Sequence, residues 1–350
     1  MTETTTQTRP PFRILLPASA GRTEWLETRR TGIGSSDVAD IMDVGYGTPL
    51  GVYYDKIGDL PLESDAGEEA LWGTLHEETV AREWARRNRS TVRRVGLIAR
   101  RDARHMMCTL DRRIAECPLN REQRETCALE VKTRNAFVAK RWKREVPDDV
   151  LAQTLWQIAV TSYSHVHVAV LIGGNDYRQY VVTRAGNEDV IADIVTVCSR
   201  MWHDHIRAGS PPPTTGDPDR LVELYEQLHS GRTGVIDLAN NPDLSVEVMN
   251  DLIDYEENRL VATAAEKRKK AARARLVGHL GKADTVSRNG ALVYSFTSSA
   301  PRQNADLDAL AERWPAAFAD VVTETPSRRL NIAKAHRLEA PKEEDTDGSA

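Results

Sequence analysis

The sequence predicts a mixed α/β domain followed by a mainly helical module. Three observations carry this prediction. Short β-like runs are interleaved with helical patterns over about the first 210 residues. The proline-rich stretch "SPPPTTGDPD" then indicates a linker, because proline and glycine interrupt regular structure. Beyond it, "LSVEVMNDLIDYEENRLVATAAEKRKKAARARLVGHL" is typical of one long, charged, alanine-rich helix.

Two stretches near the N-terminus predict helices. "TEWLETRRTGIGSSDVADIMDV" predicts a helix, a Gly-Ile-Gly turn and a second helix capped by Ser35 or Ser36. In "EEALWGTLHEETVAREWARRN" apolar residues recur at near-helical spacing, which indicates an amphipathic helix. These apolar residues are Leu71, Leu75, Val80 and Trp84.

Five β-like runs supply the predicted sheet. They are "STVRRVGLIAR", "RHMMCTLDRRIAE", "TCALEVKT", "VHVAVLIGG" and "YRQYVVTR". Between the third and fourth runs, "PDDVLAQTLWQIAVTSYS" opens with proline and acids, as helix N-termini do. After the fifth run, "NEDVIADIVTVCSRMWHDHIRAG" predicts a closing helix that Gly209 ends. We therefore expect a central mixed sheet flanked by helices.

These elements give a domain plan with five parts. The α/β domain is expected over residues 21–210, and a proline-rich linker is expected over residues 211–219. A helical module over 220–336 contains a hairpin at "DTVSRNGALVYSF", with Asn289-Gly290 as its turn, and a strand-like "SRRLNIAK". Residues 1–20 and the acidic residues 337–350 are expected to be flexible or disordered.

Composition restricts the class of protein. The chain has 350 residues, of which 40% are hydrophobic and 28% charged, as in ordinary globular proteins. It contains no apolar run near the roughly 20 residues of a membrane helix and no apolar signal core in "MTETTTQTRPPF". We therefore expect a cytoplasmic protein with no membrane partner.

The distribution of charge favours a nucleic-acid partner although the total does not. Net charge is −5, but residues 82–144 contain 19 Lys/Arg against 7 Asp/Glu. A local excess of one sign is a better guide to partners than the total. "KRWKRE", within this segment, is either a solvated helix face or a surface that follows phosphates.

Cysteines and histidines show no ligand spacing of a familiar metal motif. None of the four cysteines forms a C-x-x-C pair, and we expect buried free thiols at 108, 117, 127 and 198. Closely spaced histidines at 165, 167, 203 and 205 could suggest a metal site. We expect instead that they are ordinary core or polar histidines.

The polar residues of "CALEVKT" pose the main chemical question. Glu130 and Lys132 are two residues apart on a predicted strand, so they share a face where charge is costly to bury. A half-exposed ion pair explains them in isolation. Asp111, at the end of another predicted run, offers a second carboxylate, and two carboxylates suit a hard divalent cation such as Mg²⁺. Glu77 and Gln153 lie on the neighbouring predicted helices.

The order Glu77, Asp111, Glu130-Val131-Lys132, Gln153 resembles the PD-(D/E)xK nuclease superfamily, and more narrowly its YqaJ-type viral recombinases, which include the phage lambda exonuclease. The matching segments are "WLETRRTGIGSSDVA", "WGTLHEETVA", "TLD…LEVKT" and "LAQTLWQIAVT". The sequence departs from this pattern at Arg112, where glycine is usual, and at Leu110, where the family has proline.

The resemblance implies a restriction-endonuclease-like core and roles for individual residues. Asp111, Glu130, Glu77 and the Val131 backbone carbonyl would hold Mg²⁺ or Mn²⁺, with Lys132 and Gln153 completing the catalytic set. Arg29 and Ser36, or Arg30 and Ser35 as the alternative pair, would hold the 5′-phosphate of a duplex end. The basic residues expected to contact DNA are Arg134, Lys140, Arg141, Lys143 and Arg144.

The resemblance also implies an activity and partners. The expected enzyme is a deoxyribonuclease that degrades one strand 5′→3′ from duplex ends and leaves a 3′ overhang. A RecT-like annealing protein would load onto that overhang, and a trimeric ring is known in the lambda relative. The basic stretch "EKRKKAARAR" of the long helix would serve as a DNA-contacting arm, an oligomerisation helix or a docking site.

Three alternatives stay open at this stage. The same centre could serve a structure-specific or restriction-type endonuclease, because fold does not fix function. A helicase-linked nuclease with an iron–sulfur cluster is disfavoured by the scattered cysteines. A DNA-binding recombination scaffold with an inactive centre is the third.

Overall fold

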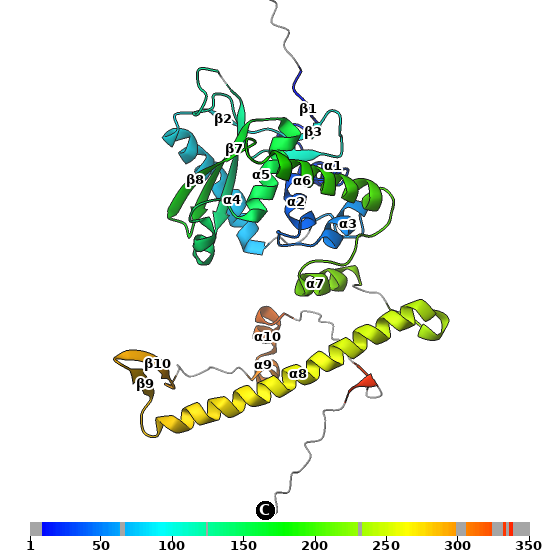
Figure 1. The fold of residues 1–350 in the computed structure, drawn as a ribbon, viewed down its shortest axis with the longest axis vertical. Coiled ribbons are helices and arrows are strands. Elements are labelled where there is room, and N and C mark those ends of the chain that lie inside the picture. Colours follow the sequence, from blue (N-terminus) through cyan, green and yellow to red (C-terminus); the bar gives the residue numbers. More distant parts are fainter. Residues whose placement is uncertain are drawn as a thin grey trace, which may run out of the picture. The chain divides into compact units, whose positions relative to one another are not determined.

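The computed structural model describes residues 9–63, 67–123, 125–229, 233–298, 306–323, 332–333 and 336–338 of the chain. The chain divides into two compact units, Met1–Gly231 and Arg232–Ala350. Figure 1 shows the helices and strands of both units. Each unit is described by itself.

A five-stranded mixed sheet is the centre of the first unit. Its strand order is β2-β5-β6-β7-β8. The pairing of β6 with β7 is parallel, whereas the other three pairings are antiparallel. This arrangement confirms the predicted α/β class with a mixed sheet flanked by helices. The strands are β2 (Val92–Arg93), β5 (Arg112–Ile114), β6 (Cys127–Arg134), β7 (His165–Ile172) and β8 (Asp176–Thr183).

The parallel pair β6–β7 determines where the helices lie. Parallel neighbours need a crossover connection, and here it runs through the 3₁₀ helix η1 (Ala136–Trp142) and helix α5 (Asp148–Thr161). Helix α5 packs on the sheet face that carries Ala128 and Val168. Helix α4 (Gly67–Arg87) packs on the opposite face, which carries Leu129. Alternate residues of β6 therefore meet different helices.

A smaller sheet and three short helices precede α4 or lie beside it. The small sheet has the order β1-β3-β4, formed by Phe12–Ile14, Leu97–Arg100 and Met107–Thr109. The predicted single run "RHMMCTLDRRIAE" is thus two strands in two sheets, β4 and β5, with Asp111 at the crossing point. Helices α1 (Arg22–Arg29), α2 (Ser35–Ile41) and α3 (Pro49–Ile57) follow one another before α4.

Two local predictions for these helices differ from the structure. Helix α2 begins at Ser35 with Gly34 as its N-cap, so neither Ser35 nor Ser36 caps it, and the N–H of Gly34 donates to the Asp37 carboxylate. In α4, Val80 and Trp84 are buried as expected, whereas Leu71 and Leu75 are 52% and 56% exposed. The first half of α4 therefore does not contribute to the core that its spacing predicted.

The predicted linker does not coincide with the boundary between the units. After helix α6 (Glu188–Arg200) and the π-helical turn Met201–Ile206, Gly209 adopts the expected positive φ. Helix α7 (Pro218–Leu228) lies within the first unit, where Leu224 and Leu228 join its core. The boundary falls at Gly231, later than the predicted 211–219, because α7 is amphipathic and buries its apolar side here.

The second unit contains the predicted long helix and hairpin. Helix α8 (Pro242–Leu280) has 39 residues and follows the 3₁₀ turn Leu238–Asn240. Strands β9 (Thr285–Arg288) and β10 (Ala291–Ser295) pair antiparallel across Asn289 and Gly290, both with positive φ as a two-residue hairpin requires. Helices α9 (Leu307–Arg313) and α10 (Pro315–Val321) follow. Residues 1–8, most of "SRRLNIAK" and the tail 339–350 lie outside the described residues.

Within the described part of the chain, no helix combines the length and hydrophobicity needed to cross a membrane.

Packing of α7 on the first unit predicts unequal effects of two substitutions on one helix. Leu224→Ala removes a buried side chain that packs in the core, and we expect it to lower the free energy of unfolding by about 2–3 kcal/mol. Val222→Ala, on the exposed side of α7, serves as the control and should change it by less than about 0.5 kcal/mol. Urea unfolding of the full chain measures both. Equal effects would contradict the packing.

Candidate active site

Asp111 and Glu130 meet where the small sheet gives way to the large one. Strand β5 pairs with β6 so that Arg112 faces Leu129, which places Asp111 beside Glu130 and Val131. The backbone N–H of Val131 donates to Asp111 Oδ2 at 2.7 Å. The two carboxylates that the sequence proposed as partners are therefore brought together by strand pairing.

Glu130 is a buried carboxylate that three nearby side chains contact through their N–H groups. Its side chain is 2% exposed, and Lys132 Nζ lies 2.6 Å from its Oε1. Gln153 Nε2 donates to the same oxygen at 2.6 Å, and Gln157 Nε2 donates to Oε2 at 2.7 Å. Three of the approximately four lone pairs of the carboxylate are thus used. The charge is tolerated because it is paired and hydrogen-bonded.

Helix α5 supplies the two amides because its packed face lies over β6. Gln153 also accepts from Lys132 Nζ at 2.7 Å, so Lys132, Gln153 and Glu130 form a closed triangle of contacts. Sequence reasoning identified Gln153 but missed Gln157. The spacing of four residues would have revealed it, since residues four apart share one helix face.

The ionisation of Asp111 reflects its surroundings. Burial raises its pKa well above the ordinary value, and the negative charge of Glu130 raises it further. Lys132 opposes this rise, and the N–H of Val131 does so as well. Two carboxylates, Glu130 buried and Asp111 half-buried, share one ammonium group, so the described side chains do not fully balance their charge.

These donors fit a hard divalent cation. Carboxylate and carbonyl oxygens are the ligands that Mg²⁺ and Mn²⁺ prefer. A cation would supply the positive charge that Asp111 and Glu130 lack, and it would oppose the effects that raise the pKa of Asp111. Asp111 and Glu130 would hold it, and Val131 and Glu77 line the same cleft.

Glu77 enters the site through Arg112, the residue that replaces the usual glycine. The Arg112 side chain is 3% exposed and makes ion pairs with Glu77 and, at 2.7 Å, with Glu78 of α4. It also donates to the carbonyl of Asp111. The guanidinium therefore connects α4 to Asp111, which directly precedes β5. It also forms an ion pair with the Glu77 carboxylate, to which the family resemblance gives a role in metal binding.

A cleft of about 1140 Å³ opens over this centre. Asp111, Glu130, Lys132 and Gln153 line it together with Glu77. Its rim carries two exposed aromatic side chains, Tyr46 and Trp72. The five residues predicted to act together in chemistry thus share one accessible space.

Arg29 and Ser36, the pair to which the family resemblance assigns the 5′-phosphate, lie in contact. Arg29 Nη2 donates to Ser36 Oγ at 2.5 Å and to Asp37 Oδ1 at 2.6 Å. The alternative pair is not assembled: Arg30 contacts Asp55 and two backbone carbonyls, and Ser35 is buried. Trp25 of the same helix as Arg29 approaches Thr109 of β4, 3.4 Å from Nε1 to Oγ1.

Asp37 and Lys56 complete this second polar group and were missed by sequence reasoning. Lys56 of α3 has a fully buried side chain whose Nζ lies 2.6 Å from Asp37 Oδ2. Burial alone would raise the pKa of Asp37, but Lys56 and Arg29 outweigh it and lower the pKa to about 2. Asp37 therefore stays ionised and fixes the position of Arg29.

The five basic residues predicted to contact DNA lie in two places. Arg134 lines the cleft and lies 3.4 Å from Asp149. The other four predicted residues are exposed on or just after η1, and Arg141 also approaches Asp149, at 3.5 Å. These four are Lys140, Arg141, Lys143 and Arg144.

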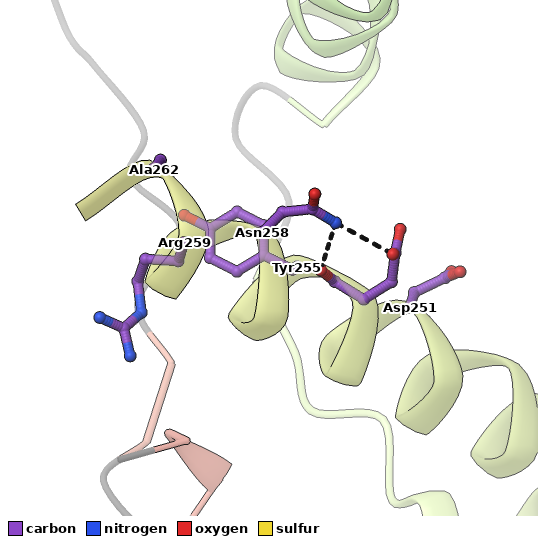
Figure 2. Close-up of a pocket in the computed structure, with 6 residues that line it drawn as sticks. Asp251, Tyr255, Asn258, Arg259 and Ala262 are labelled. Atoms are coloured by element: carbon purple, nitrogen blue, oxygen red, sulfur yellow. Dashed lines mark hydrogen bonds between the residues drawn. The ribbon is translucent and has the colours of Figure 1, made fainter. Parts of the chain in front are cut away.

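A second hollow lies on the second unit and has a different character. Its volume is about 550 Å³, and its lining residues all belong to α8. Asn258 Nδ2 donates to the carbonyl and the carboxylate of Asp254, both contacts within one helix. Figure 2 shows Asn258 among the residues that line the hollow. Arg259 pairs with Glu256 one turn earlier. These contacts stabilise α8 and assemble no catalytic set.

Together, the mixed sheet and the carboxylate–lysine centre define the class of restriction-endonuclease-like PD-(D/E)xK proteins. A family model described as the YqaJ-like viral recombinase domain matches residues 24–164. The uncharacterized protein YqaJ of Bacillus subtilis (strain 168) is 31% identical over 227 residues, which cover 63% of this chain and 68% of that protein. The chain belongs to the YqaJ-like viral recombinase family.

Two solved structures are similar to this chain at lower sequence identity. The alkaline exonuclease LHK-Exo from Laribacter hongkongensis is 17% identical with a TM-score of 0.43, covering 53% of this chain and 93% of its own. Its complex with dAMP is 18% identical, with the same TM-score and coverage. This overlap is too small to assign an activity to the chain.

Loss of the buried guanidinium should destabilise the first unit. Arg112→Ala leaves Glu77 and Glu78 without their shared partner, and we expect the free energy of unfolding to fall by about 3 kcal/mol. The exposed Arg104→Ala is the matched control and should change it by less than about 0.5 kcal/mol. Denaturant unfolding measures both. A small effect of Arg112→Ala would show that the two glutamates are adequately solvated without it.

Asp37 should make stability depend on pH in a defined window. Its pKa is lowered in the folded state, so its contribution is complete above about pH 4 and is lost as pH falls towards 2. Asp37→Asn should therefore cost about 2–3 kcal/mol at pH 7, and the difference from the unchanged chain should shrink below pH 4. Urea unfolding at several pH values measures it, with the exposed Asp59→Asn as control. A pH-independent difference would contradict this account.

Proposed function

We propose that this chain is a divalent-metal-dependent deoxyribonuclease that starts at duplex ends and degrades one strand 5′→3′. The product would be a 3′ single-stranded overhang for recombination by strand annealing. Membership of a viral recombinase family supports the recombination role. The observation that carries the nuclease proposal is the contact set of Lys132, Gln153 and Glu130 beside Asp111 at an open cleft.

The residues divide the chemistry of phosphodiester hydrolysis among them. Lys132 presents its ammonium at the cleft, held by Gln153 and Glu130, where it can orient the attacking water and stabilise negative charge on the phosphate. Gln153 fixes Lys132 relative to Glu130, so the ammonium does not have to reorganise during reaction. Gln157 holds the second oxygen of Glu130 and keeps the carboxylate in place.

Mg²⁺ or Mn²⁺, held by Asp111 and Glu130 with Glu77 and the Val131 carbonyl as further candidates, would lower the pKa of the attacking water and neutralise charge on the phosphate. Deprotonated Asp111 and Glu130 are required for such binding. Arg112 keeps Glu77 close to this position from α4.

Recognition of an end is assigned to Arg29 and Ser36. A guanidinium and a hydroxyl in contact form a donor pair suited to a terminal phosphate, and Asp37 holds the guanidinium in place. An enzyme that cuts internally has no use for such a pair. The exposed Trp72 and Tyr46 at the cleft offer surfaces on which bases can stack. Arg134, Lys140, Arg141, Lys143 and Arg144 would follow the phosphates.

The remaining partners follow from the same proposal. A RecT-like single-strand annealing protein would receive the 3′ overhang, in the cytoplasm of a bacterial or phage-infected cell. A homo-oligomer, such as a trimeric ring around DNA, would keep the enzyme on its substrate. Helix α8, with its run of exposed basic residues, is the candidate for DNA, subunit or partner contact.

One nuclease assay tests the proposal. The purified full chain with Mg²⁺ is mixed with linear duplex labelled at the 5′ end, the same duplex labelled at the 3′ end, and a covalently closed circle. We expect mononucleotides to be released first from the 5′ label, with circles intact. Lys132→Ala should reduce the rate at least about 100-fold, whereas the exposed Lys282→Ala should not.

A second arm tests end recognition. Arg29→Ala should slow degradation of 5′-phosphorylated duplex much more than of 5′-hydroxyl duplex, whereas Arg104→Ala should affect neither. Nicked or linearised circles would replace the proposal with an endonuclease. DNA binding without any cleavage would leave a recombination scaffold.

A further inference from the structure

Four metal-ligating side chains converge on the sheet face that α4 covers. They are Cys117, Cys127, His165 and His167, all buried, with their ligand atoms within 4.8 Å of one another. Cys117 Sγ lies 3.0 Å from His165 Nε2 and 3.4 Å from His167 Nε2. The cysteines are free and buried and both histidines lie in the core, as the sequence predicted. The sequence did not reveal that these two thiols and two imidazoles lie together.

Strand register explains the convergence. Ala128 of β6 is paired with Val166 of β7, so Cys127 and His165 begin neighbouring strands at the same end of the sheet. His165 and His167 are alternate residues of one strand and share a face. Cys117 follows β5 and is fixed by a turn, in which its N–H donates to Glu125 and its carbonyl accepts from Asn120.

The donor set matches one class of ion. Two thiolates and two imidazoles are the ligands of tetrahedral Zn²⁺. Bond lengths of about 2.3 Å to sulfur and 2.1 Å to nitrogen would place neighbouring ligand atoms about 3.4–3.8 Å apart in a tetrahedron. The distances from Cys117 Sγ to the two imidazole nitrogens, 3.0 and 3.4 Å, lie close to this range. All four ligand atoms lie within 4.8 Å of one another, so side-chain movements of about 1 Å or less would complete a tetrahedron. Four buried protein ligands leave no open position, which is typical of structural sites.

The surroundings orient these ligands. Ser164 Oγ contacts His165 Nδ1 at 2.6 Å and also bonds to Glu125, which leaves His165 Nε2 facing the cysteines. Such outer contacts on the second ring nitrogen are usual for metal-bound histidine. The Trp84 ring packs against His167 with 5.0 Å between ring centroids. Apolar Ile114 and Leu129 complete the shell and keep water away.

We propose that Cys117, Cys127, His165 and His167 bind one structural Zn²⁺, separate from the carboxylate centre. Binding would release the two thiol protons to solvent and form two Zn–S and two Zn–N bonds. The ion would join β6 and β7 to the loop between β5 and β6. It lies on the α4 face of β6, whereas Glu130 contacts α5 on the other face.

Metal analysis of the purified full chain tests the proposal. We expect one zinc per chain after dialysis against a weak chelator, with no iron and no acid-labile sulfide. Cys117→Ser and Cys127→Ser should each reduce the bound zinc at least tenfold. Cys198→Ser is the matched control, because Cys198 is equally buried but lies on α6, and it should retain the zinc. Replacement by Co²⁺ should give the visible spectrum of a tetrahedral, thiolate-ligated ion.

The outcomes separate this site from the nuclease centre. Asp111→Asn should keep its zinc while losing activity with Mg²⁺. The zinc content of the unchanged chain decides the question even where a cysteine variant fails to fold. A metal-free chain that takes up neither Zn²⁺ nor Co²⁺ would overturn the proposal. So would a disulfide between Cys117 and Cys127, or zinc that the cysteine substitutions do not release.

Discussion

The buried carboxylate of Glu130 is the constraint on which the first unit depends. A charge in the middle of a sheet is stable only where donors reach it, and these come from one neighbour on its strand and two amides on α5. Helix α5 lies there because β6 and β7 are parallel and need a crossover of this length. The topology of the sheet and the polar centre therefore require each other.

A second buried charge plays a similar part near the N-terminus. Lys56 would be costly without Asp37, and Asp37 in turn holds Arg29 beside Ser36. Arg112 does the same between α4 and the start of β5. In each case a buried charge, Asp37 or Arg112, fixes the position of a partly exposed partner, Arg29 or Glu77. Rigid placement of a reactive or binding group is obtained in this way without a loop.

The sequence could predict those parts of the site that lie within one strand or one helix. The shared face of Glu130 and Lys132 was predicted from their positions as alternate residues of a strand, and Asn289-Gly290 predicted the hairpin turn. Gln153 was placed by resemblance, whereas Gln157 needed the helix face. Lys56 could not be found, because its partner lies on another helix and only tertiary packing brings them together. The boundary at Gly231 depends likewise on the packing of α7, which a proline-rich stretch cannot reveal.

The opposite faces of β6 have a consequence for folding fidelity. The positions of Cys127 and Glu130 in β6 differ by an odd number, so the two side chains point to different sides of the sheet. A slip of one residue in the pairing of β6 would turn the carboxylate and ammonium towards Trp84 and the thiol towards α5. Any slip by an odd number of residues would therefore bury unpaired charge on one side and lose the thiol–imidazole contacts on the other. Polar groups on both faces of β6 therefore disfavour every alignment of this strand that is shifted by an odd number of residues.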